Sequence, residues 1–323
     1  MAAHPVFVSL TPVFLLIGVG FVAARMQWVR GESVRDLSNL VFLVLTPALL
    51  FRTMSQVHLE QVDLRPMLAY FMAAGILLVV SIAMRGFNRR SVVMALAGAF
   101  SNMVMIGIVL VGLAYGQEGL VTLLTLVSVH ALILLTIGSV TLELVVAREA
   151  GQSGGRAPNL LATAASAIKG SIIHPVPLPI LAGLLFAQTG WDLPSVVDRP
   201  LQLLGNAFGP LALVLVGVSL ARTSMGGHWR DVLAIVLVKN LVLPVLVGLS
   251  AWLWGIRGLP LTVLVLAGAL PIGANVYLFS QRYEVAEDLS TASMGVSTMA
   301  ALFTISLVML VMSWLNPLNV VTG

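Results

Sequence analysis

The chain has 323 residues, of which 59% are hydrophobic and only 9% are charged. A soluble domain of this size carries roughly a quarter of its residues charged, so the composition excludes a soluble enzyme. The formal net charge is only +4 and cysteine is absent, which argues against a polyanion-binding surface and excludes disulfides and thiolate metal sites.

Ten apolar stretches are long enough to cross a hydrocarbon layer, which takes about 20 helical residues. They cover residues 5–24, 34–54, 66–85, 91–115, 119–146, 170–189, 200–221, 229–254, 259–281 and 288–314. The first ten residues contain no Lys or Arg, so the first stretch is expected to be a retained helix rather than a signal peptide. We therefore expect an all-α membrane protein with ten spanning segments, numbered here in chain order.

Basic residues set the expected orientation of these segments. Of the 17 Lys and Arg residues, 12 fall in loops after odd-numbered segments, four in loops after even-numbered segments, and Lys239 within the eighth segment. Cytoplasmic loops are the ones enriched in Lys and Arg. The pattern predicts a multi-pass protein of the bacterial inner membrane with both termini in the periplasm.

The polar stretch at residues 148–169 is expected to be a cytoplasmic linker. It separates two five-segment repeats, residues 1–147 and 170–323. Homologous repeats with an odd number of segments must have opposite orientations in the membrane. The sequence Leu-Ala-Gly-Ala-Phe at residues 96–100 is echoed by Leu-Ala-Gly-Ala-Leu at residues 266–270, which supports two inverted repeats.

Each echoed sequence is followed by polar or helix-breaking residues in the middle of its segment. Pro271 lacks a backbone N–H and clashes with the preceding turn, so the ninth segment is expected to break there. Broken helices at matching positions of two repeats are typical of a transporter's binding site, and half-helix N-termini favour anions. The alternative is that these residues only help helices to pack. The candidate substrate-binding residues at the two breaks are Ser101, Asn102, Gly107, Pro271, Gly273 and Asn275.

Two ionisable residues lie inside segments. Lys239 is a candidate for substrate binding and charge balance, the alternative being a lysine that pairs structurally or extends toward the membrane surface. His130 in the fifth segment is a candidate for proton coupling, the alternative being a hydrogen bond between helices. No metal-ligand spacing, nucleotide-binding loop or catalytic motif occurs in the sequence, so we expect no cofactor, no metal, no nucleic-acid partner and no catalytic residues.

Four further features of the chain form a recognisable set: Leu270–Tyr283, the Val-Ser-Thr sequence at 296–298, Lys239–Pro244 and Pro47. At these residues the sequence resembles the auxin efflux carrier family, which includes bacterial members named for malonate and malate transport. The resemblance implies a fold similar to bile-acid symporters and sodium/proton antiporters, with unwound fourth and ninth helices that cross at the substrate site. It also implies a scaffold and dimer interface from helices 1, 2, 6 and 7, and a transport domain from helices 3–5 and 8–10.

Within this resemblance, Asn102 and Asn275 match the family's crossover asparagines. Val109 stands where the family often has a proline, so a gentler break is expected in the fourth segment, with Ser101 and Gly107 supplying the bend. We expect a secondary carrier of a small organic anion that works by an elevator movement and forms a homodimer in the bilayer. The alternatives are a carrier of the same fold for a cation or neutral solute, a non-transporting membrane sensor, and a membrane-embedded enzyme.

Overall fold

The computed structural model describes residues 5–57, 63–152, 165, 176–223 and 229–316, and these form helices joined by short turns. Six of the described helical stretches are long and apolar enough to cross a membrane: Gly31–Met54, Arg65–Arg85, Met103–Glu149, Ser195–Ala221, Trp229–Leu253 and Glu287–Leu315. Shorter apolar helices cover Leu10–Arg25, Pro177–Ala187 and Gly258–Ala269. The protein is thus a helical, multi-pass membrane protein, and the count of ten crossings stays a prediction.

The first half of the chain forms, in order, α1 (Pro5–Arg25), α2 (Gly31–Leu40), the π-helical turn η1 (Val41–Leu45), α3 (Thr46–Met54), α4 (Arg65–Arg85), α5 (Arg89–Ala99), the π-helical turn η3 (Met103–Gly107) and α6 (Ile108–Gln152). Gly116 interrupts α6 with φ 61° and ψ −152°, a conformation that glycine adopts readily. It separates the expected fourth segment from the fifth. Most of the expected linker, residues 148–169, lies outside the described residues.

The second half forms α8 (Pro177–Ala187), α9 (Ser195–Ala221), α10 (Trp229–Leu237), the π-helical turn η4 (Val238–Val242), α11 (Leu243–Leu253), α12 (Gly258–Ala269), α13 (Asn275–Arg282) and α14 (Glu287–Leu315). The turns η1 and η4 precede Pro47 and Pro244, each the second residue of its helix. Proline removes a backbone donor, and a π-helical turn is one way for a helix to absorb that loss. Both helices therefore continue past their prolines.

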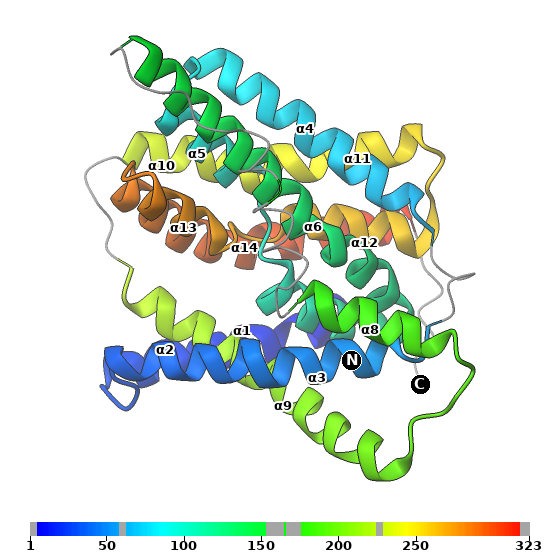
Figure 1. Ribbon diagram of the computed structural model, residues 1–323. Helices are drawn as coiled ribbons and strands as arrows, with labels where there is room; N and C mark the ends of the chain where they lie inside the picture. The colour runs from blue at the N-terminus through cyan, green and yellow to red at the C-terminus, as the bar shows by residue number, and fades with distance from the viewer. Residues whose placement is uncertain (1–4, 58–62, 153–164, 166–175, 224–228, 317–323) are drawn as a thin grey trace.

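The helices form two groups (Figure 1). In the lower group, α1 packs against α9, and α3 packs against both α8 and α9. The upper group contains α4, α5 and α10–α14, while α6 and α14 contact helices of both groups. The contact between α1 and α9 is very close, because a Cβ atom at Gly217 would lie 1.9 Å from the Ile17 carbonyl oxygen and one at Gly20 would lie 2.0 Å from that of Val214.

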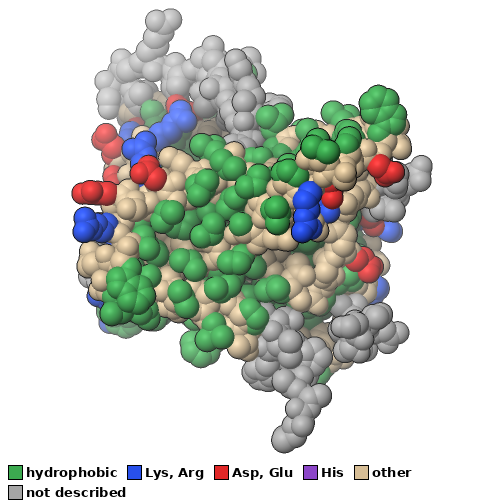
Figure 2. Space-filling view, turned by 90° about the horizontal axis from the view of Figure 1, so that it is seen from below, with side chains coloured by type: hydrophobic (Ala, Val, Ile, Leu, Met, Phe, Trp, Pro, Cys, Tyr) green, Lys and Arg blue, Asp and Glu red, His purple; other side chains and the backbone are tan. Residues whose placement is uncertain are grey.

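Figure 2 shows the face formed by the lower group. Hydrophobic side chains are spread over the whole of this face, and charged side chains lie mainly toward its left and right edges. Large apolar residues are widely exposed, including Leu15 at 64%, Val196 at 83% and Trp314 at 78%. Such a surface is costly in water but suits contact with lipid, as expected for helices that cross a bilayer.

Candidate functional site

The breaks in the fourth and ninth segments lie against each other. Ser101 and Ile272 form an isolated antiparallel bridge. The Asn102 N–H donates to the Pro271 carbonyl at 2.8 Å, and the Gly273 N–H donates to the Phe100 carbonyl at 2.9 Å. Backbone groups freed from helices inside a membrane need such partners, so each break satisfies the other. The two echoed sequences thus end at one crossing point.

The break after α12 follows from proline. Leu270, which precedes Pro271, has φ −59° and ψ 152°, the extended conformation that proline favours in its predecessor. The break after α5 has no proline, and Phe100 is nevertheless extended, at φ −88° and ψ 108°. The expectation of a gentler break in the fourth segment is therefore wrong. This break forms without a proline because the ninth segment supplies hydrogen-bond partners for the backbone groups of Phe100 and Asn102.

Two glycines let the broken segments approach. A Cβ atom at Gly107 would lie 2.7 Å from the Leu270 side chain, and one at Gly273 would lie 2.8 Å from the Phe100 ring. Gly107 lies in the turn η3 and not at the break itself. The sequence suggested that Gly107 bends the chain. In the structure it instead leaves room for the Leu270 side chain of the ninth segment.

Both crossover asparagines retain free polar groups. The Asn102 Oδ1 atom accepts from the Met105 N–H at 3.3 Å and so caps η3, while no described residue is hydrogen-bonded to its Nδ2 atom. Asn275 is the first residue of α13, and no described residue is hydrogen-bonded to its side chain. Both residues are only half-buried. Their unpaired amide groups can therefore bind a ligand at the crossing.

Several side chains that the sequence did not single out hold the breaks in place. Ser297 on α14 accepts from the Ile272 N–H at 3.1 Å and donates to the Asn240 Oδ1 atom at 2.6 Å. The hydroxyl groups of Tyr70 on α4 and Ser101 are hydrogen-bonded at 3.0 Å. The only signal for Ser297 in the sequence was the Val-Ser-Thr stretch of the resemblance, and nothing in the sequence distinguished Tyr70.

Lys239 is fully buried, with 0% of its surface exposed. Its Nζ atom donates to the Gly268 carbonyl oxygen at 2.7 Å and also to that of Leu270. These carbonyls lie at the C-terminal end of α12, where a helix leaves acceptors without partners and where a positive charge is favourable. The structure therefore brings Lys239 to the crossing, and its amine contacts the backbone of α12.

His130 lies beside the other break. Its ring is edge-on to Phe100, with ring centroids 4.7 Å apart, and lies 5.7 Å from the Tyr70 ring. The His130 Nε2 atom is buried and has no hydrogen-bond partner among the described residues. His130 is therefore an aromatic neighbour of the crossing, and its role in proton coupling stays a prediction.

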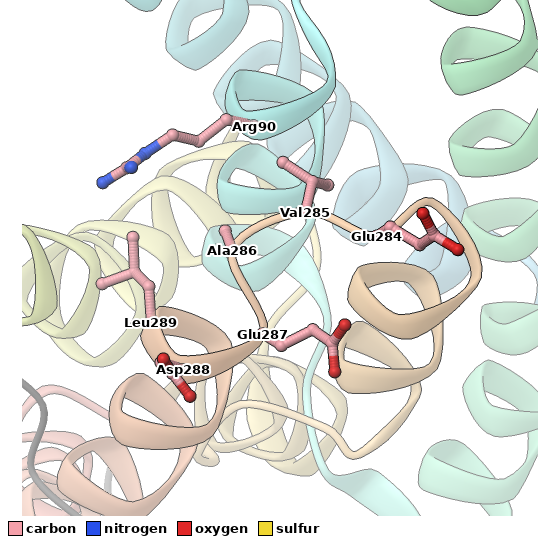
Figure 3. A pocket seen from close by; sticks show the side chains of 7 residues that line it. All are labelled: Arg90, Glu284, Val285, Ala286, Glu287, Asp288 and Leu289. Atoms are coloured by element: carbon pink, nitrogen blue, oxygen red, sulfur yellow. The ribbon is translucent and has the colours of Figure 1, made fainter.

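A surface pocket of about 380 Å³ lies at the turn between α13 and α14. Figure 3 shows the seven residues that line it, and none of them is a candidate substrate-binding residue. They are Arg90, Glu284, Val285, Ala286, Glu287, Asp288 and Leu289. The eight residues of α13, which rise about 12 Å along the helix axis, separate this pocket from Asn275. The pocket is thus distinct from the crossing.

The described residues contain no group of three or more His, Asp or Glu side chains able to hold a metal ion. At the crossing, two helical stretches end, α5 and α12, and two begin, η3 with α6 and α13. The ends of the first pair present carbonyl groups, the starts of the second pair present N–H groups, and the asparagine amides lie at these starts. This arrangement suits the binding of a small polar ligand.

Comparisons with known proteins find matches over most of the chain. Residues 5–309 match the model of a family described as "Membrane transport protein". A Rhizobium meliloti protein named "Putative malonate transporter" is 26% identical over 303 residues, covering 91% of this chain and 92% of that protein. An Escherichia coli protein named "Uncharacterized transporter YfdV" is 22% identical over 306 residues, covering 92% and 94%. An Arabidopsis thaliana protein named "Auxin efflux carrier component 8" is 27% identical over 124 residues, which is 36% of this chain and 34% of that protein.

Proposed function

The chain belongs to the membrane transport protein family that includes the auxin efflux carriers, and from this premise we propose that it is a secondary carrier of a small organic anion. We further propose that the anion, a mono- or dicarboxylate, binds at the crossing of the two broken segments. The observation that carries this proposal is the pair of half-buried asparagines with unpaired amide groups, Asn102 and Asn275, at the starts of helical stretches. An amide N–H group and a helix start both favour a carboxylate.

The charges buried in the described part of the chain favour an anion over a cation. Among the described residues, the buried polar and charged side chains include Lys239 and His130 but no Asp or Glu. A cation bound in the membrane interior normally needs carboxylate partners or a dense set of oxygen ligands. A carrier of the same fold for a neutral solute remains the second candidate, and Lys239 disfavours it.

Contacts between helix ends support ten crossings in two inverted repeats. If the predicted orientation is applied, each of several long-range polar contacts joins two helix ends on the same side of the membrane. On the predicted cytoplasmic side these are Arg89–Glu149, Arg90–Asp231 and Arg222–Val29, and on the predicted periplasmic side they are Arg52–Asp198, Gln117–Thr53 and Asn316–Gly258. A missed or extra segment would place some of these pairs on opposite sides.

The proposed movement follows from the two groups of helices. The lower group, α1, α3, α8 and α9, corresponds to the scaffold expected from helices 1, 2, 6 and 7, and the upper group holds both broken segments (Figure 1). Because the breaks are hydrogen-bonded to each other, the binding site can move as one body past the scaffold. We propose that this elevator movement carries the anion across the inner membrane in a homodimer joined through the scaffold.

Ligand-dependent stability tests the proposed site. We would measure thermal unfolding of the purified protein with a panel of mono- and dicarboxylates, for the wild type and for Asn275→Ala. A ligand that binds only the folded state raises its stability by about 2.7 kcal/mol at a hundred times Kd. The control is Asn206→Ala, because Asn206 is an exposed residue of α9 and belongs to neither of the broken segments.

We expect one acid or a few related acids to stabilise the wild type and Asn206→Ala but not Asn275→Ala. The same acids should exchange across the membrane of liposomes that contain the protein. If no carboxylate stabilises the wild type, the substrate class is wrong. If Asn275→Ala responds like the wild type, the location of the site is wrong.

A further inference from the structure

A buried charge lies in the described interior of the protein. Among the described residues, Lys239 is the only Lys, Arg, Asp or Glu that is buried, and its side chain is fully enclosed. A buried charge in a membrane protein is costly and is retained where it has a function. The hydrogen bonds of Lys239 go to carbonyl oxygens, which carry partial charges only, so no carboxylate of the described residues neutralises it.

The position of Lys239 makes its charge act on the crossing. The Leu270 carbonyl that it contacts precedes Pro271, whose own carbonyl accepts from the Asn102 N–H. Four helix ends meet here, two N-terminal and two C-terminal. Each N-terminal end is equivalent to about +0.5 charge and each C-terminal end to about −0.5, so the four cancel. Lys239 then leaves the crossing with a net charge of about +1.

We propose that Lys239 is a positioning residue that sets the charge of the transported species at −1. Lys239 does not touch the ligand. It acts through the C-terminal carbonyls of α12, because its hydrogen bonds hold these carbonyls in place and its charge offsets their negative partial charge. This inference rests on the proposed anion-carrier function and names the charge class of its substrate. A monoanion neutralises the crossing, whereas a dianion leaves one negative charge and a neutral ligand leaves one positive charge in a medium of low dielectric constant.

Three probes of nearly the same shape test the charge class. They are malonate, malonamate and malonamide, which at pH 7 carry two, one and no negative charges because carboxyl groups are then ionised. Each would be measured as a competitor of the transported acid in liposomes and by thermal stabilisation of the purified protein. For the wild type we expect malonamate to bind at least about tenfold more tightly than either of the others.

Variants at the lysine separate charge from packing. In Lys239→Met the side chain loses its terminal amine and its charge but keeps the rest of its length, so we expect malonamate to lose at least about tenfold more affinity than malonamide. Lys239→Arg keeps the charge and should keep malonamate as the best probe. Ser297→Ala loosens the break at Ile272 without altering charge, and it should weaken the three probes by similar factors.

Two results would overturn the inference while leaving the proposed function intact. One is a wild type that binds malonate best, or that does not distinguish the three probes, although carboxylates are transported. The other is Lys239→Met weakening all three probes equally, as Ser297→Ala is expected to do, because a role in packing alone gives that result. If Lys239→Met does not fold, the order of the probes on the wild type and on Lys239→Arg decides. If no carboxylate binds or is transported, the proposed function fails and the inference fails with it.

Discussion

Two serines on α14 offer a matched test of how the ninth segment is held at its break. Ser293 and Ser297 are one turn apart and both have 0% exposure. The Ser297 hydroxyl has two partners, the Ile272 N–H and the Asn240 Oδ1 atom, whereas the Ser293 hydroxyl has no hydrogen-bond partner among the described residues. Replacing each with alanine removes the same atom from equally buried sites, so the difference between the two variants measures the hydrogen bonds.

In Ser297→Ala, two buried polar groups lose their partner. Hydrogen bonds inside membrane proteins average about 0.6 kcal/mol, while a buried group left unpaired costs about 1–3 kcal/mol, so we expect a loss of about 1–3 kcal/mol in unfolding free energy. In Ser293→Ala an unsatisfied hydroxyl disappears, so stability should stay within about 0.5 kcal/mol or rise.

The measurement is thermal or denaturant unfolding of both variants and the wild type in the same detergent. A carrier of this size should show a melting temperature several degrees lower for Ser297→Ala only. Equal losses in the two variants would refute the reasoning, because they would show that packing at α14, and not the bond to Ile272, determines the effect. A neutral Ser297→Ala would show that the break is held by its pairing with the fourth segment alone.

Three further predictions concern helix packing, the second break and orientation. Gly217→Ala should lower the free energy of unfolding by more than about 2 kcal/mol, since its Cβ would lie 1.9 Å from a carbonyl oxygen of α1. The Cβ of Gly18→Ala would meet nothing within 4 Å, so this variant should be neutral or stabilising. Thermal unfolding of both variants checks this. Tyr70→Phe should cost about 1 kcal/mol by leaving its serine partner at the break unpaired, and transport should slow; a wild-type melting temperature would contradict it. Because native cysteine is absent, single cysteines test the orientation: a membrane-impermeant maleimide should label Gln188→Cys in intact cells but not Glu284→Cys, and the reverse result would invert the topology.

Local features of the fold were predictable from the sequence because their causes are local. Apolar stretches reveal membrane helices through composition alone, and Pro271 removes a backbone donor at the point where the ninth segment breaks. Gly116 lies where the fourth and fifth segments were expected to separate. These features depend on residues that are neighbours in the chain, so one sequence is enough to find them.

The hydrogen bonds that hold the two breaks in place were not predictable, because they join residues far apart in the chain. A break without proline after α5 exists because the ninth segment supplies Pro271 and Gly273 as backbone partners. The sequence placed Lys239 in a membrane segment, but it could not show that the amine reaches the end of α12. Tyr70 looks like any buried aromatic residue until its partner, Ser101, is known.

The bridge between Ser101 and Ile272 also bears on how the protein is made. These residues are 171 positions apart, and translation at about 5–20 residues per second takes about 10–30 s to cover that distance. During this interval the first broken segment has been synthesised, but its backbone partners have not. The first half of the chain must therefore wait in the translocation machinery or in the bilayer with these groups unpaired, so completion of the second half is the step that commits the chain to its final structure.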